Sequence, residues 1–189
     1  MMKKYRTHLL ILVVVLQTAA LMGMVAIKQR TLATGREIVL ETAPIDPRSL
    51  FRGDYVRLNY VIGSLDYADM EGDEDFDRHD RVYVMLREHE DGWKAVSIHR
   101  EMPAHGPESV IIRGEVQYSG IWTGSETRDG INIRYGIENY FVPEGEGRAL
   151  ERPAENEVVS ILVAVDKDGD SAIKAVLING EIRYEEKLF

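Results

Sequence analysis

The residues of this sequence best suited to chemistry are clustered carboxylates. Glu138, Glu144 and Glu146 stand within nine residues, in a stretch that also contains Gly and Pro. Carboxylates at such spacing can work as a general acid and base, or can ligate a cation. They can equally accept hydrogen bonds from backbone amides and arginines, which would keep an irregular loop in shape. We favour this structural role, and we predict no cofactor and no metal.

A second group of carboxylates is denser. Residues 66–80 hold eight Asp or Glu residues in 15 positions. Such a segment is typical of a solvated loop, and the alternative is a weak site for a divalent cation. Residues 166–170 do not match an EF-hand loop, which needs Gly at position 6 and Glu at position 12, whereas Gly169 stands at position 4 and Leu177 at position 12. We predict a hairpin turn there instead.

A serine nucleophile is not predicted. Residues 50–54 are similar to the L-x-x-G-D that follows the nucleophile of signal peptidases, but Ile45 occupies the position of the serine. The first lysine after this segment is Lys94, which is too distant for a Ser–Lys dyad. The histidines at positions 79, 89, 99 and 105 form no metal-binding pattern. An enzyme that uses carboxylates is therefore the least favoured function.

An apolar segment near the N-terminus predicts a membrane anchor. Residues 9–27 are 19 positions without a charge, and as a helix they would be about 29 Å long, close to a hydrocarbon core of about 30 Å. A cleaved signal peptide is the alternative, but its apolar region would be shorter and would end at a small-x-small site. Met24-Val25-Ala26 is a poor site, and Thr18-Ala19-Ala20 is acceptable in residue type but is followed by further apolar sequence. Gln17 and Thr18, in the middle of the span, could bond a neighbouring helix.

Charge divides the chain at the same place. Residues 1–30 carry five basic and no acidic residues, whereas residues 31–189 carry 18 basic and 32 acidic residues, a net charge of −14. We therefore predict a cytoplasmic N-terminus with its anchor over residues 1–30 and an acidic domain over residues 31–189. That charge repels nucleic acid, so we predict no nucleic-acid partner. The basic residues before the span slightly exceed those after it, which places the domain outside the cytoplasm.

After the anchor the hydrophobic period falls to two, the pattern of half-buried strands. Asp91-Gly92 and Asn179-Gly180 are turn signals between consecutive strands, which favours antiparallel pairing. Residues 158–165 are apolar at nearly every position and predict a central strand covered on both faces. A short helix is expected around residues 147–152. The predicted fold is all-β, an antiparallel barrel or sandwich preceded by one N-terminal transmembrane helix.

One segment resembles a known family motif. The sequence Gly53-Asp54-Tyr55-Val56-Arg57-Leu58-Asn59-Tyr60 resembles the naming motif of the GDYXXLXY family of bacterial membrane-anchored proteins, and Gly53, Asp54, Tyr55, Leu58 and Tyr60 match all its fixed positions. Residues 135–147 also resemble that family, which has no established activity. Its members are often encoded beside a multi-spanning membrane protein. The resemblance thus implies an integral membrane partner and a location in the bacterial cytoplasmic (inner) membrane.

The motif can also be interpreted from its alternation. Asp54, Val56, Leu58 and Tyr60 share one strand face, which is apolar, so Asp54 is expected to point inwards and to need partners. Its predicted role is to fix the preceding turn to the sheet, and the alternative is an Asp at a binding site. Tyr55 lies on the opposite face and is the better candidate for contact with a partner.

These observations lead to one functional hypothesis and one main alternative. The hypothesis is a membrane-tethered, non-enzymatic envelope domain that assembles with an integral membrane protein. The alternative is a ligand-binding or cation-binding sensor of the envelope, motivated by the acidic residues 66–80 and by the cluster of Glu138, Glu144 and Glu146.

Overall fold

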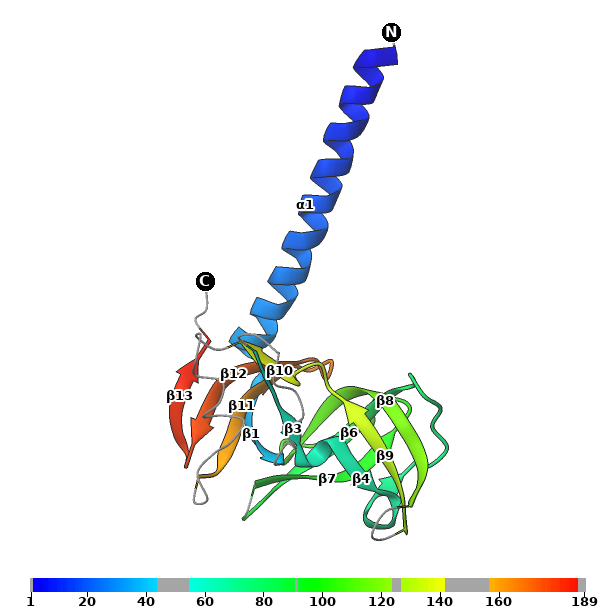
Figure 1. Ribbon diagram of the computed structural model, residues 1–189, viewed down its shortest axis with the longest axis vertical. Coiled ribbons are helices and arrows are strands. Elements are labelled where there is room, and N and C mark those ends of the chain that lie inside the picture. The colour runs from blue at the N-terminus through cyan, green and yellow to red at the C-terminus, as the bar shows by residue number, and fades with distance from the viewer. Residues whose placement is uncertain (1, 44–54, 91, 124–126, 142–156, 187–189) are drawn as a thin grey trace.

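A single long helix projects from a β domain (Figure 1). The computed structural model describes residues 2–43, 55–90, 92–123, 127–141 and 157–186. Helix α1 spans Met2–Thr34, and its large apolar side chains from Leu9 to Ile27 are 50–70% exposed. It is the one helix in the described chain that is long and apolar enough to cross a membrane. A helix that is apolar all round and has no protein cover is typical of a membrane span.

A five-stranded sheet begins directly after the helix. Strand β1 (Arg36–Ala43) pairs in antiparallel fashion with β11 (Val159–Val165), with Arg36 opposite Val165. The strand order is β13 (Glu181–Glu185), β12 (Ser171–Ile178), β11, β1 and β3 (Asn59–Tyr60). Strand β11 is buried at six of its seven positions and lies between two neighbours, so the prediction of a central strand is confirmed.

A six-stranded sheet forms the second layer. Its order is β4 (Ser64–Asp66), β9 (Thr127–Arg134), β8 (Ser109–Thr123), β6 (Arg81–His89), β7 (Gly92–His99) and β5 (Glu71–Gly72). A two-stranded ribbon, β10 (Asn139–Phe141) with β2 (Tyr55–Arg57), stands beside the two sheets. Neighbouring strands are antiparallel except β5 and β7, which are parallel. The prediction of an all-β, antiparallel fold is thus confirmed, and the short pair β5–β7 is a parallel addition at one edge.

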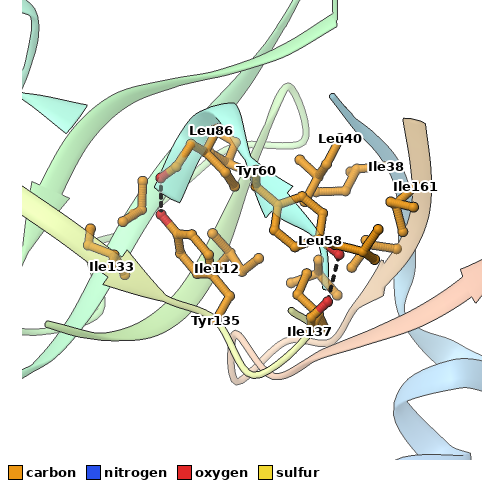
Figure 2. Packing of buried hydrophobic residues seen from close by; sticks show 14 of the residues in the cluster. Ile38, Leu40, Leu58, Tyr60, Leu86, Ile112, Ile133, Tyr135, Ile137 and Ile161 are labelled. Carbon is orange, nitrogen blue, oxygen red and sulfur yellow. Dashed lines mark hydrogen bonds between the residues drawn. The ribbon is translucent and has the colours of Figure 1, made fainter. Parts of the chain in front are cut away.

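The hydrophobic core lies between the sheets and draws on almost every strand. Ile38 and Leu40 of β1 and Ile161 of β11 meet Leu86 of β6 and Ile112 of β8, and all five side chains are at most 1% exposed. Figure 2 shows these side chains around two tyrosines, which are described below. The alternation of apolar and polar residues along each strand supplies one buried face per sheet, which is why two sheets pack.

The motif segment forms two short strands instead of one continuous strand. Strand β2 pairs with β10, β3 pairs with β1, and the chain then enters the 3₁₀ helix η1 (Val61–Gly63). The strand breaks because these few residues change partners between two sheets. Residues 66–80 also differ from the predicted loop, since they contain the 3₁₀ helix η2 (Tyr67–Asp69) and strand β5. The short helix expected around residues 147–152 lies outside the described residues.

Candidate functional site

Two buried tyrosines join the motif segment to residues 135–138. The Tyr60 hydroxyl donates to the carbonyl oxygen of Ile137 at 2.7 Å, and the Tyr135 hydroxyl donates to the carbonyl oxygen of Ile62 at 2.7 Å. The two bonds run in opposite directions between the same two segments (Figure 2). The tyrosines are only 5% and 6% exposed. Each hydroxyl therefore satisfies a buried carbonyl that would otherwise lack a donor.

Burial and charge keep both hydroxyls protonated. Loss of water around the ring raises the pKa of Tyr60 well above its usual value, and the nearby Glu138 carboxylate raises it further. The same two causes, in the same order, raise the pKa of Tyr135. A tyrosine whose pKa is raised keeps its hydroxyl proton at neutral pH. These two groups are therefore suited to hydrogen bonding and not to acid–base work.

Glu138 closes the turn between the two tyrosine contacts. Its carboxylate accepts the amide N–H of Tyr135 at 2.5 Å and that of Gly136 at 3.0 Å, and its backbone carbonyl accepts the amide of Leu58 at 2.7 Å. Gly136 has φ +79°, a conformation that favours glycine. These are the amide contacts that the loop-shaping interpretation of the cluster expects from Glu138. Glu144 and Glu146 lie outside the described residues.

Two of the fixed motif positions lie in the core of the described chain. Leu58 and Tyr60 are 3% and 5% exposed and belong to the core. Gly53 and Asp54 lie outside the described residues, and Tyr55 is described only by its backbone, which pairs with Phe141 across β2 and β10. The exposed side chains of this ribbon are Arg57, Asn139 and Phe141, and Phe141 is 76% exposed. We call these three residues the ribbon's outer face.

A second structured region joins the helix to the domain. The Thr31 side chain is 1% exposed, and its hydroxyl donates to the Asp166 carboxylate at 2.8 Å. The Lys28 ammonium donates to the carbonyl oxygen of Ser171 at 2.8 Å. Gly35 follows with no room for a side chain, since a Cβ would lie 2.6 Å from the Thr31 carbonyl oxygen and 2.9 Å from the Val165 nitrogen. The last helical turns thus pack on β11 and β12 as part of the fold.

The turn between β11 and β12 receives this helix end. The Asp166 carboxylate accepts the amides of Asp168 and Asp170, each at 3.0 Å, in addition to the Thr31 hydroxyl. Asp170 forms an ion pair with Arg113 of β8, and Gly169 has φ +81°. The predicted hairpin turn is confirmed, and its carboxylates are occupied by backbone and side-chain donors of the chain itself.

The sequence matches the GDYXXLXY protein family over residues 17–176, which is most of the chain. The chain belongs to the GDYXXLXY family. No curated protein and no solved structure matches it. In this member of the family, the naming motif supplies Leu58 to the core and Tyr60 to the tyrosine pair, so part of the motif is needed for the fold itself.

Three of the eight carboxylates of the acidic residues 66–80 bond within the described domain. Asp66 accepts the amide of Ala68 at 3.0 Å, Asp73 accepts the amide of Arg100 at 2.9 Å, and Asp80 pairs with the Arg100 guanidinium at 3.1 Å. Within the described ranges, no three His, Asp or Glu side chains converge as metal ligands would. These three carboxylates thus bond to backbone amides and to one arginine.

Sequence reasoning did not single out Tyr135, Thr31 or Gly35. A signal for Tyr135 was available, because it stands at an apolar strand end and a buried tyrosine needs a partner for its hydroxyl. No comparable signal exists for Thr31 and Gly35. Their importance depends on how the helix meets β11 and the turn that follows it, and the Thr31 contact there is with a residue 135 positions further along the chain.

Proposed function

We propose that this chain is a membrane-tethered, non-enzymatic β domain that assembles with an integral membrane partner. The observation that carries the proposal is the junction of α1 with the domain. The helix passes into β1 through Gly35 alone, and the Lys28 and Thr31 contacts attach it to β12 and to the β11–β12 turn. A helix attached in this way orients the domain, which a flexible linker would not do.

The same junction supports an uncleaved anchor. The side chains of Lys28 and Thr31 belong to the packed domain, so removal of the helix would also remove contacts of the fold. The proposed location is the bacterial cytoplasmic membrane, with a single span and the C-terminal domain outside the cytoplasm. Its support is the 27-residue apolar span from His8 to Thr34 and the greater positive charge before residue 9.

Two surfaces are available to a partner in the membrane. One is the exposed helix itself, where Gln17 and Thr18 offer polar side chains inside an apolar span. The other is the ribbon's outer face, and β10 lies at the helix end of the domain along its long axis (Figure 1). Exposed aromatic residues are enriched at protein interfaces, and Phe141 is such a residue. A partner that crosses the membrane could contact both surfaces.

The test is photo-crosslinking in native membranes of the full-length chain. A photoreactive amino acid is placed at Gln17, Tyr55 or Phe141, with a control at Ile182 of β13, which is 57% exposed. We expect the first three probes to capture one defined integral membrane protein and the Ile182 probe to capture none. Capture of nothing at all three positions, in protein that is membrane-bound and folded, would contradict the proposal.

A further inference from the structure

A cleft of about 350 Å³ opens between the end of β1 and the far part of the six-stranded sheet. Its walls come from β1, η1, β4, η2, β7 and one residue of β9, and the strands β4 and β7 lie in the half of the domain away from the helix (Figure 1). Ile62, whose carbonyl oxygen accepts the Tyr135 hydroxyl, is one of its lining residues, but neither tyrosine lines it, and no residue of the ribbon's outer face or of the helix junction does. It is therefore a separate feature of the domain.

The cleft has an apolar floor. Val61 is 54% exposed, and Leu65, Met70 and Trp93 are half-buried side chains that pack against the core from outside. An aromatic ring, a flexible thioether and two branched side chains offer a surface that can bury one or two apolar groups of a ligand. A volume of about 350 Å³ is at the lower end of ligand pockets, about 300–1,000 Å³. It fits side chains, not a whole helix.

The remaining lining is acidic. Glu41, Asp66 and Asp69 line the cleft, against Lys94 as the basic residue among the described lining residues. Asp66 accepts the Ala68 amide, whereas the exposed side chains of Glu41 and Asp69 make no hydrogen bond or ion pair within the described part of the chain. Two carboxylates beside an apolar floor are complementary to a ligand in which a positively charged group stands next to an apolar group.

Further carboxylates lie near η2, which also favours a basic ligand. The pKa of Tyr67 is raised, first by burial of the ring and then by the charges of Asp129, Asp75 and Glu74. Three carboxylates outside the lining thus add negative charge near η2, whereas the Arg36 guanidinium lies 5.0 Å from the centroid of the Trp93 ring. Negative charge attracts a basic group and disfavours an anionic one.

We propose that this cleft binds an extracytoplasmic peptide segment of the membrane partner, in which a Lys or Arg side chain pairs with Glu41 and Asp69 while an apolar neighbour packs on Met70 and Trp93. This inference rests on the proposed function, because the segment belongs to the same partner. The position of the cleft away from the helix requires a segment outside the membrane and not a transmembrane helix. A bare metal ion would leave the apolar floor uncovered, so the floor favours a peptide.

The experiment uses the full-length chain in native membranes with a photoreactive amino acid at Val61. We expect capture of the protein that the Phe141 probe captures, and mass spectrometry should place the crosslink within a few residues of a Lys or Arg in an extracytoplasmic segment. Reversing both charges, Glu41→Lys with Asp69→Lys, should lower the Val61 capture by at least about tenfold. The matched control is Glu181→Lys with Glu185→Lys on the exposed strand β13, which should leave capture unchanged.

A reciprocal change makes the test specific. If the basic residue of the captured segment is replaced by Glu, capture by the unmodified chain should fall, and the Glu41→Lys, Asp69→Lys chain should recover it. Thermal unfolding of each variant checks that the domain is folded, which is expected because both carboxylates are exposed.

The outcomes separate this inference from the proposed function. If the Phe141 probe captures the partner while the Val61 probe captures nothing, the cleft inference is wrong and the assembly remains. Capture at Val61 that is unchanged by the charge reversal, or that falls on a segment without a basic residue, also overturns it. If no probe at Gln17, Tyr55, Phe141 or Val61 captures a protein, both proposals fail together.

Discussion

At the scale of single residues, the motif is connected to the rest of the domain by the hydroxyls of Tyr60 and Tyr135. Each ring fills the core, and each hydroxyl reaches a backbone carbonyl of the other segment at 2.7 Å. The two tyrosines therefore stabilise the domain in two ways, by burial of their rings and by the hydrogen bonds of their hydroxyls. The polar part matters because a buried carbonyl without a donor costs about 1–3 kcal/mol.

Replacing either tyrosine with Phe tests that polar part. We expect Tyr60→Phe and Tyr135→Phe each to lower the free energy of unfolding by about 1–3 kcal/mol, because Ile137 or Ile62 loses the donor to its carbonyl. The control is Tyr83→Phe, since the half-buried Tyr83 makes no hydroxyl bond to a described residue, and its change should stay within about 0.5 kcal/mol. Denaturant unfolding in detergent micelles gives the values. Equal losses in all three variants would contradict the role of the bonds.

The raised pKa values of Tyr60 and Tyr135 predict a loss of stability in alkali. An unfolded tyrosine ionises near pH 10, roughly, whereas the folded pKa of both is higher. Above that pH the unfolded chain has released protons that the folded chain keeps, so stability is fully present below about pH 10 and is lost as the pH rises further. Each buried tyrosine contributes a slope of up to about 1.4 kcal/mol per pH unit. The double variant Tyr60→Phe, Tyr135→Phe should show a shallower decline, and an identical slope would refute this explanation.

At the scale of elements, the sequence predicted the strands better than their connections. The apolar run of residues 158–165 located β11, and the Asp91-Gly92 and Asn179-Gly180 signals located the β6–β7 and β12–β13 hairpins, because both kinds of signal belong to the local sequence. Asn179 and Gly180 have φ +53° and +81°, which is what the Asn-Gly signal predicts for a hairpin turn. The break between β2 and β3 was not predictable, since both retain the same alternation while they pair with different strands.

In the candidate site, too, burial could be predicted from the sequence, whereas contacts between distant segments could not. Val56, Leu58 and Tyr60 were placed on one buried face from spacing alone, and all three are at most 5% exposed. The partner of the Tyr60 hydroxyl could not be predicted, because it is a backbone carbonyl 77 residues away. The cleft could not be predicted either, since Glu41, Asp69 and Trp93 meet only after two sheets have packed.

Gly35 is the element-scale position where a small change should have a large effect. In Gly35→Ala the new Cβ would lie 2.6 Å from the Thr31 carbonyl oxygen, a backbone atom that cannot move aside without displacing the helix. We expect a loss of about 1–3 kcal/mol in unfolding free energy and faster proteolysis between α1 and β1. Gly23→Ala is the matched control, because nothing lies within 4 Å of its Cβ. Similar behaviour of the two variants would show that the junction tolerates rearrangement.

At the scale of the whole molecule, helix α1 and the β domain are joined by direct contacts. The contacts of Thr31 and Lys28 attach the helix to the five-stranded sheet, and that sheet shares its core with the six-stranded sheet. These contacts therefore set the directions of the ribbon's outer face and of the cleft relative to α1. Assembly with a partner in the membrane would depend on these directions.

The alternative of a cation sensor also has a whole-molecule test. A cation that binds only the folded chain must raise its stability, by about 2.7 kcal/mol at a hundredfold excess over the dissociation constant. We expect no change in the melting temperature of the full-length chain when millimolar Ca²⁺ or Mg²⁺ is added, since the described residues contain no convergent group of three ligands. A rise that is abolished by Glu144→Gln with Glu146→Gln would favour the sensor instead.

Rotating the domain about its anchor tests the orientation directly. Two alanines inserted after Ile27 lengthen the helix and turn everything that follows by about 200°, whereas four alanines turn it by about 40° and raise it by about 6 Å. If the partner contacts both α1 and the ribbon's outer face, capture by a Phe141 probe should fall strongly with two alanines and largely return with four. The junction contacts lie beyond the insertion and stay intact, so the domain remains folded in both chains. Equal capture by both chains would mean that the helix is only a tether and that the partner binds the domain in any orientation.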